Sequence, residues 1–212
     1  MKRLRKKYTG KSIRFYQCGE YGDLNARPHY HACLFGHDFH DKTHHQTTKN
    51  ADKLYTSQTL DKIWGKGFCT IGELNFKTAA YCARYIMKKI NGEQADAHYR
   101  YVNEKTGEEF QIIPEYTTMS RRPGVAANWY KNWKTDVYPS DQVIINGIPM
   151  QPPKYYDSLL EQENPFLYDD IKHDRLQNAE KYSHENTPER LHVKHKVAQA
   201  QAKLLSRTLE EL

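Results

Sequence analysis

His29 and His31 are the two residues whose type and spacing most clearly permit chemistry. They lie in an aromatic and apolar run bounded by Pro28 and Gly36, a composition that predicts a buried strand. Alternate residues of a strand point to one face, so the two imidazoles would project together, with Tyr30 in the core on the other face. Two neutral imidazoles on one strand suit a divalent metal ion, although a lone His-x-His pair often only faces solvent.

A carboxylate precedes the two histidines. Residues 12–18 have the composition of a second strand, and Glu20 follows in a glycine-rich turn. An antiparallel pairing of the two strands would bring Glu20 beside the histidine strand. One carboxylate and two imidazoles leave coordination positions open for water and a phosphate oxygen, which a catalytic metal needs. Taken alone, Glu20 is equally a polar turn residue; beside His29 and His31 it is the predicted third ligand.

Two tyrosines share one face of a predicted helix over residues 76–90. Asn75 can cap the start of this helix, and a glycine follows its end. Tyr81 and Tyr85 are four residues apart and therefore lie one turn apart, with Lys88 close to the same face. The pair supplies two candidate nucleophiles. The alternative is that both tyrosines are core or interface aromatics.

The positive charge of the chain is concentrated. The net charge is +6 and the pI is near 9.0. Residues 1–7 are basic, and Arg121 and Arg122 shortly precede Trp129 in an aromatic and cationic stretch. Cations interleaved with flat rings suit single-stranded nucleic acid, because cations meet phosphates and rings stack on bases. A solvated basic surface is the alternative for any one of these clusters.

Four segments, taken in order, resemble the replication initiation proteins of microviruses, and of the gokushovirus branch in particular. These segments are residues 18–22, 27–32, 79–89 and 119–124. Such proteins are HUH-superfamily rolling-circle endonucleases, and the resemblance extends over roughly residues 2–135. It implies a site-specific nick in single-stranded or origin phage DNA, a covalent 5'-phosphotyrosine, and later religation of the circle.

The resemblance also assigns roles by position. The matching residues are His29 and His31 as ligands of Mg²⁺ or Mn²⁺ with Glu20 as a third, Tyr81 and Tyr85 as nucleophiles, and Lys88 as the lysine three after a catalytic tyrosine. The implied partners are single-stranded DNA or the replication origin, and the host helicase and polymerase in the bacterial cytoplasm. Related proteins carry a threonine-rich strand before the basic segment, so we expect further coding sequence upstream.

Two other functions remain open. One is a relaxase or transposase with the same HUH chemistry, acting on a mobile element. The other is a single-stranded DNA-binding protein that keeps the fold without nicking. Covalent attachment of the protein to DNA separates both nucleases from the binding protein.

The predicted fold is α+β. A central antiparallel sheet would carry the histidine strand inside it, with the two-tyrosine helix packed beside it. We predict an endonuclease domain over residues 1–138 and a charged, partly helical or flexible extension over residues 139–212. Two hairpins are expected near residues 99–113 and 142–150, a strand near 67–71, and a solvated loop over the histidine-rich residues 37–50.

Composition excludes two classes of protein. The chain has no run of about 18 apolar residues, so we expect no membrane span and no membrane partner. Four cysteines are scattered without metal-binding spacing, at positions Cys18, Cys33, Cys69 and Cys82. They predict buried, reduced thiols rather than a zinc ribbon.

Overall fold

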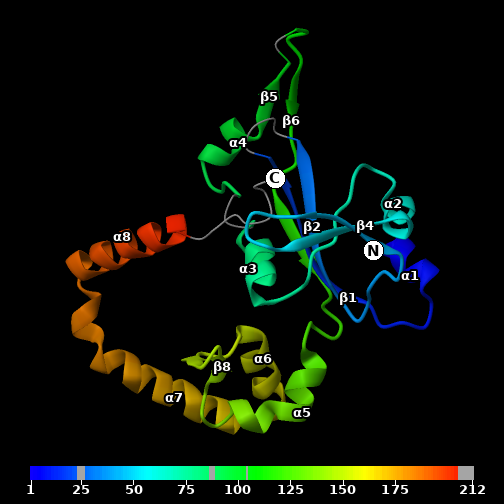
Figure 1. Ribbon diagram of the computed structural model, residues 1–212. Helices are drawn as coiled ribbons and strands as arrows, with labels where there is room; N and C mark the ends of the chain where they lie inside the picture. Colours follow the sequence, from blue (N-terminus) through cyan, green and yellow to red (C-terminus); the bar gives the residue numbers. More distant parts are fainter. Residues whose placement is uncertain (23–26, 86–88, 104, 205–212) are drawn as a thin grey trace. The chain divides into compact units, whose positions relative to one another are not determined.

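A computed structural model describes residues 1–22, 27–85, 89–103 and 105–204 of the chain (Figure 1). The chain divides into two compact units, Met1–Val125 and Ala126–Ser206. The division therefore lies earlier than the expected boundary after residue 138. Each unit has its own hydrophobic core and is described here by itself.

A three-stranded antiparallel sheet organises the first unit. Its strands are β1 (Arg14–Tyr21), β2 (Pro28–Phe35) and β7 (Tyr116–Met119), in the order β2-β1-β7. In the described part of the chain β1 is therefore the central strand, and the histidine strand β2 lies at an edge rather than inside the sheet. The sequence does not predict β7, because this short strand forms through pairing with a segment about a hundred residues earlier.

The register of β1 and β2 decides which side chains share a face. Glu20 pairs with His29, and Cys18 pairs with His31. Directly opposite residues of an antiparallel pair project to the same side, so these four side chains occupy one face of the sheet. Tyr30 lies on the other face as expected, but it is 53% exposed and is not a core residue.

Helices of the first unit lie against both faces of this sheet. They are α1 (Lys2–Lys7), α2 (Gln58–Trp64), α3 (Phe76–Arg84) and α4 (Gln94–His98). Buried residues of α3 form a cluster with Cys18 and Cys33 of the sheet, whereas α1 and α2 contribute to a second cluster around Ile13 and Phe39. The sheet therefore has α3 on the face that carries Glu20 and His31.

The start of α3 follows the sequence prediction and its end does not. The Asn75 side chain accepts from the Thr78 backbone at 3.0 Å, and the Thr78 hydroxyl accepts from the Asn75 backbone at 2.9 Å. Reciprocal caps of this kind contribute about 1 kcal/mol. The described helix ends at Arg84, and Ile90 is not helical. Residues 86–88, including Lys88, lie outside the described part of the chain.

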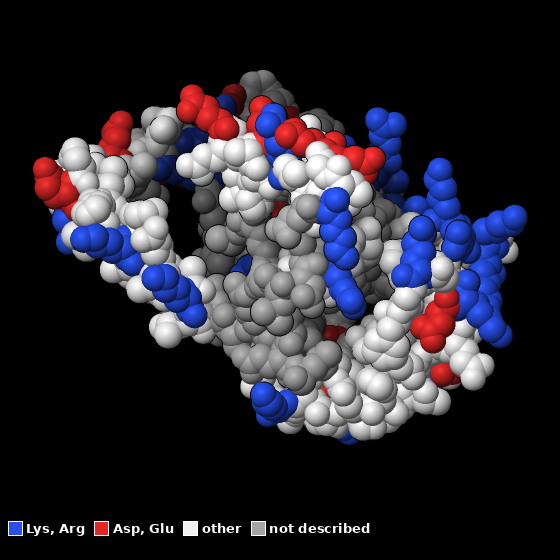
Figure 2. Space-filling view, turned by 90° about the horizontal axis from the view of Figure 1, so that it is seen from above, with Lys and Arg blue, Asp and Glu red and all other residues white. Residues whose placement is uncertain are grey.

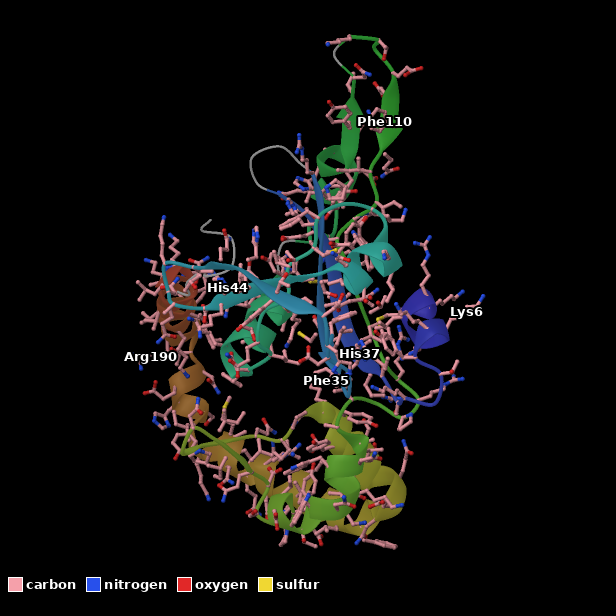
Figure 3. All side chains as sticks on the ribbon, turned by 45° about the vertical axis from the view of Figure 1, so that its right-hand side comes forward. Lys6, Phe35, His37, His44, Phe110 and Arg190 are labelled. Atoms are coloured by element: carbon pink, nitrogen blue, oxygen red, sulfur yellow. The ribbon has the colours of Figure 1, made fainter. Side chains whose placement is uncertain are left out.

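Two hairpins complete the first unit. They are β3 (Lys42–Thr47) with β4 (Lys53–Ser57), and β5 (Arg100–Val102) with β6 (Glu109–Gln111). The second was predicted; the first lies where a solvated loop was expected, and that expectation is wrong because His44 and its neighbours form β3 (Figure 3). The strand expected at 67–71 is reduced to one bridge between Tyr55 and Ile71.

The second unit is largely helical. It contains α5 (Ala127–Val137), β8 (Val143–Ile145), β9 (Ile148–Met150), α6 (Lys154–Glu163), α7 (Pro165–Lys181), η2 (Ser183–Asn186) and α8 (Pro188–Leu204). Tyr130 and Val137 of α5 are buried with Tyr156, Leu160 and Ile171 from α6 and α7. These contacts place α5 in the second unit, which explains the earlier boundary. The predicted 142–150 hairpin is present around Asn146, at a positive φ of 52°, and the glycine that follows.

Two predictions from composition can be compared with the structure. No helix among the described residues is long and apolar enough to cross a membrane. All four cysteines are free; Cys18, Cys33 and Cys82 are buried, as expected, and Cys69 is only partly buried.

Candidate active site

The imidazole of His31 connects the two predicted halves of the site. Its Nε2 lies 3.2 Å from Oε1 of Glu20. The same ring stacks on Tyr85, with centroids 4.4 Å apart and planes 12° apart, and meets Tyr81 edge-on at 5.8 Å. The strand that carries the histidines and the helix that carries the tyrosines therefore meet at one residue. Four of the predicted site residues come together there, from β1, β2 and the end of α3.

The two tyrosines contact each other as well as His31. The Tyr85 hydroxyl donates to the Tyr81 hydroxyl, and the two rings meet edge-on at 4.9 Å. The predicted one-turn spacing on one helix face is thus present at the end of α3. Both side chains are buried, with Tyr81 4% and Tyr85 5% exposed, and they pack with Cys18, Cys33 and Cys82. The pair is therefore part of a core as well as part of the candidate site.

The buried carboxylate of Glu20 influences its neighbours. Glu20 is 4% exposed, so its charge is only weakly screened by solvent. Burial, followed by the charge of Glu20, raises the pKa of the Cys18 thiol to about 11. Cys18 therefore stays protonated at neutral pH, and its thiol donates to the backbone oxygen of Cys82 at 3.5 Å. A neutral thiol is a poor metal ligand, so Cys18 fills the core beside the site rather than adding to its ligands.

His29 lies apart from this group. It is exposed, although it stands directly across from Glu20 in the register. Its ring lies against Gly22, where a Cβ atom would be only 2.6 Å from Cε1 of the imidazole. Among the described residues no group of three histidine, cysteine, aspartate or glutamate side chains converges tightly enough to hold a metal. The donor types suit a divalent cation, but only Glu20 and His31 are in contact.

The predicted DNA-binding residues are distributed over both units. Arg121 and Arg122 are exposed in the first unit, where Arg121 bridges Gly124 and the Arg122 carbonyl accepts from Arg14 at 3.4 Å. Trp129 belongs to the second unit, where it stacks on Tyr156 at 5.7 Å. Within the first unit, exposed cations are available for phosphates. Sequence order alone suggested one continuous cluster, and the division between the units separates its members.

Arg84 is a site residue that the sequence reasoning missed. Its guanidinium lies over the Tyr81 ring, 5.9 Å from the ring centroid. The signal was present, because Arg84 follows Tyr81 by three residues on a helix. Lys88, the cation that was predicted for this face, lies outside the described residues.

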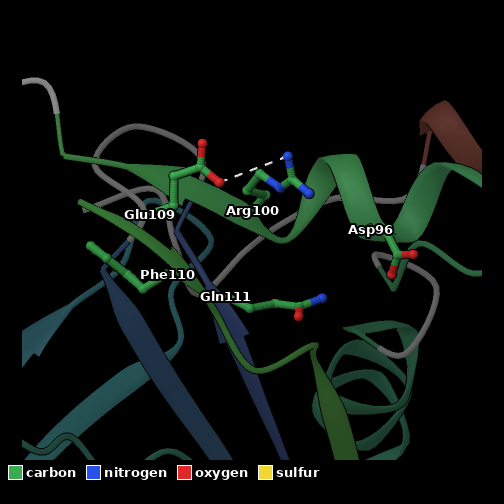
Figure 4. A pocket seen from close by; sticks show the side chains of 5 residues that line it. All are labelled: Asp96, Arg100, Glu109, Phe110 and Gln111. Atoms are coloured by element: carbon green, nitrogen blue, oxygen red, sulfur yellow. Dashed lines mark ion pairs between the residues drawn. The ribbon is translucent and has the colours of Figure 1, made fainter. Parts of the chain in front are cut away.

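A pocket elsewhere in the first unit holds none of these residues. It is lined by Asp96, Arg100, Glu109, Phe110 and Gln111, beside the β5–β6 hairpin (Figure 4). An ion pair between Arg100 and Glu109 at 3.8 Å crosses it. The pocket lacks a nucleophile beside a base, so we assign it no chemistry.

Comparisons with known proteins point to one group. Residues 1–90 match a family model of phage-type replication proteins, described as replication-associated protein ORF2. That range contains every predicted metal ligand and both tyrosines. No solved structure matches the chain.

Three curated relatives are phage proteins. The chain is 32% identical over 190 residues to replication-associated protein ORF2 of Spiroplasma virus 4, covering 85% of this chain and 55% of that protein. It is 27% identical over 149 residues to replication-associated protein VP4 of Bdellovibrio phage phiMH2K, covering 69% and 43%. For replication-associated protein ORF4 of Chlamydia phage 1, the identity is 27% over 169 residues, covering 75% and 39%. The chain thus spans about half the length, or less, of the relatives it matches.

Proposed function

Because the chain is related to the replication-associated proteins of phages, as its motifs predicted, we propose that it initiates rolling-circle replication by nicking single-stranded or origin DNA. The observation that carries this proposal is the position of His31, in contact with Glu20 on one side and with Tyr85 and Tyr81 on the other. A carboxylate, an imidazole and two phenols at one place are the groups that a tyrosine-dependent nuclease needs.

Glu20, His31 and His29 would hold the divalent ion, Mg²⁺ or Mn²⁺. The side chain of His29 would have to turn from Gly22 toward Glu20, which its exposed position permits. When bound, the ion would draw charge from the scissile phosphate. The hydrogen bond to Glu20 orients the imidazole of His31, as carboxylates commonly do for metal-binding histidines.

Tyr81 and Tyr85 would exchange a phosphoryl group with DNA. The phenolic oxygen attacks phosphorus, the bond from phosphorus to the 3'-oxygen breaks, and that oxygen leaves as a hydroxyl after taking a proton. The 5' phosphate stays on the tyrosine as an ester. Attack by a 3'-hydroxyl on this ester restores the phosphodiester and frees the tyrosine, so closure of the circle needs no ATP. Two adjacent phenols allow one to hold an end while the other cuts again.

Cations near the tyrosines would stabilise charge on the phosphate. Lys88 is proposed for this role from its position three residues after Tyr85, and Arg84 already lies over Tyr81. Arg121, Arg122 and Trp129 are proposed to bind the flanking DNA through phosphates and stacking. The 3'-hydroxyl that is released would serve a host polymerase and helicase inside the infected cell.

One observation favours a second candidate. Tyr81 and Tyr85 are nearly as buried as any core residue, which suits a single-stranded DNA-binding protein in which both are structural. In that case the chain would bind DNA but never form a bond to it.

A trapping assay separates the candidates. The chain is incubated with Mn²⁺ and single-stranded circular phage DNA, then denatured and separated by electrophoresis. The proposed function predicts DNA that migrates with the protein after denaturation and is released by a protease. Binding without such an adduct, in the presence of Mn²⁺ and of the cognate origin, would support the second candidate instead.

A further inference from the structure

The sheet face opposite the candidate active site carries aromatic rings at its centre. Tyr30 of β2 and Tyr116 of β7 are the register neighbours of Gly19 in β1, one on each side. A Cβ atom on Gly19 would lie 2.8 Å from Cε1 of Tyr116 and 3.3 Å from Cε1 of Tyr30. The two rings thus lean together over the one residue that leaves room for them.

Further side chains extend this surface. Trp64, at the end of α2, meets Tyr30 edge-on with centroids 5.2 Å apart. Tyr21 lies on the same face, one step along β1, and its hydroxyl donates to the carbonyl of Ile113 at 3.1 Å. We call Tyr21, Tyr30, Trp64 and Tyr116 the aromatic face.

The aromatic face is open among the described residues. Tyr30 is 53% and Tyr116 39% exposed, in the middle of a sheet where rings are commonly covered. Neither ring belongs to a hydrophobic cluster of the first unit. Exposed rings on adjacent strands therefore need a reason other than stability.

Positive charge borders the aromatic face. Five of the six residues of α1 are lysine or arginine, and Figure 2 shows blue side chains gathered on the side where Figure 1 draws α1 and α2. The guanidinium of Arg3 donates to the carbonyls of Ile63 and Trp64 at 3.2 and 3.1 Å. Arg5 lies over the ring of Phe15, which is on the same sheet face, at 5.3 Å. Cations are therefore attached directly to the edge of the aromatic face.

We infer that the aromatic face is a second binding surface for single-stranded DNA, separate from the site around His31. Rings on adjacent strands of an antiparallel sheet can stack on unpaired bases, and neighbouring cations meet the phosphates. A protein partner would suit the rings but not the dense charge of α1. The inference shares with the proposed function only the substrate class. This surface would hold DNA beside the segment that is cut on the opposite face.

Fluorescence of Trp64 tests this placement. The full chain has three tryptophans, at positions 64, 129 and 133; Trp129→Phe with Trp133→Phe leaves Trp64 as the single reporter. Titration with an oligothymidine of about 12 nucleotides should quench this fluorescence as the DNA binds. Binding of labelled oligothymidine, followed by anisotropy, with unchanged Trp64 fluorescence would overturn the inference, and so would the absence of binding at low salt.

A matched pair of substitutions gives the second measurement. Tyr30→Leu in the otherwise unchanged chain should weaken oligothymidine binding roughly tenfold, since one stacking ring is lost. Phe110→Leu removes a similarly exposed ring, 48% exposed on β6, and should leave the affinity unchanged (Figure 3). Equal affinities of the two variants, with equal melting temperatures, would contradict the inference.

The two proposals can fail separately. Quenching of Trp64 in a chain that never forms a covalent adduct would leave the aromatic face standing and remove the nicking function. Adduct formation without any effect of DNA on Trp64 would do the reverse.

Discussion

Each unit of the chain buries a pair of tyrosines, and the two pairs are held in opposite ways. In the second unit the Tyr138 hydroxyl donates to Asp157 at 2.8 Å, and Tyr130 donates to Glu163 at 3.2 Å. In the first unit the Tyr85 hydroxyl donates to Tyr81, and the Tyr85 ring stacks on His31. The same residue type is fixed by carboxylates in one place and placed beside an imidazole in the other.

The environment determines what each phenol can do. Burial and then the charge of Glu163 raise the pKa of Tyr130 to about 12, and burial with the bond to Asp157 raises the pKa of Tyr138 well above its usual range. A phenol whose ionisation is opposed in this way is a poor nucleophile. The second pair is therefore structural, and it is the internal control for the first.

The largest expected effect comes from removing both phenols of the first pair. Tyr81→Phe with Tyr85→Phe should abolish covalent attachment to DNA, because both proposed nucleophiles are lost while their rings still fill the core. Each single substitution should retain some nicking, since the partner can replace it, but should fail to complete rounds of cutting and closure. The measurement is the yield of denaturation-resistant adduct and of released circles.

The control for this change is Tyr130→Phe with Tyr138→Phe. It should cost stability through two lost hydrogen bonds, about 1 kcal/mol each, and leave the adduct yield per folded molecule unchanged. Adduct formation by the Tyr81 and Tyr85 double variant would show that another residue is the nucleophile. Normal circle release by either single variant would show that one of the two tyrosines is structural.

The second prediction separates the two histidines. His29→Ala should reduce adduct formation by about 10-fold or more, the usual cost of weakened metal binding, with no change in melting temperature because the side chain is exposed. His31→Ala should reduce the adduct as strongly and also lower stability by about 1 kcal/mol, since it removes the hydrogen bond to Glu20. Thermal melting and adduct yield are measured together.

His44→Ala is the matched control, because His44 is an exposed histidine on β3. Both of its readouts should equal those of the unchanged chain. Full activity of His29→Ala in Mn²⁺ would rule out the proposed ligand set.

The third prediction concerns the support of the structural pair. Arg175 binds Asp141 at 2.6 Å and Asp157 at 2.8 Å. Arg175→Met should destabilise the second unit by about 3 kcal/mol, because two poorly exposed carboxylates lose their cation. Denaturant unfolding measures this loss, while the adduct yield per folded molecule should not change. A variant as stable as the parent chain would show that the network contributes no net stability.

The fourth and smallest effect is a difference in acid sensitivity between the units. Burial would raise the pKa of Asp157, but hydrogen bonds from Arg175 and Tyr138 outweigh it and lower that pKa below its usual range. The unfolded chain then takes up the proton first as the pH falls, so the second unit loses stability below about pH 4. His37 gives the first unit an earlier onset.

The ring of His37 lies 4.3 Å from Tyr8 and 4.8 Å from Phe39. Burial, and then the charge of Lys11, lower the pKa of His37 against the opposing charge of Asp38. The unfolded chain binds this proton first, so the first unit should lose stability as the pH falls below about 6.5. His37→Phe should remove this slope in unfolding free energy between about pH 7 and pH 5; an unchanged slope would assign it to other groups.

The sequence predicted the parts of this fold that depend on local signals. The Asn75 cap, the glycine turn after Asn146 and the apolar run around His31 each specify an element by themselves. Strand β3 was missed because its residues, including His44, are polar on both faces and carry no alternating pattern.

Long-range contacts explain the other differences. The place of β1 at the centre of the sheet depends on β7, and the unit boundary depends on Tyr130 packing against Tyr156. The contact between His31 and Tyr85 follows from the register of β1 with β2 and from the side on which α3 packs. Residue types could nominate these two side chains, but only the fold brings them together.

The most direct test of the account is the identity of the residue that becomes linked to DNA. The denatured adduct is digested with nuclease and protease, and the peptide that carries the phosphate is sequenced by mass spectrometry. The account predicts phosphate on Tyr81 or Tyr85 and on neither Tyr130 nor Tyr138. Phosphate on any residue outside the first pair, or no linked peptide from a chain that is shown to bind the same DNA, would contradict it.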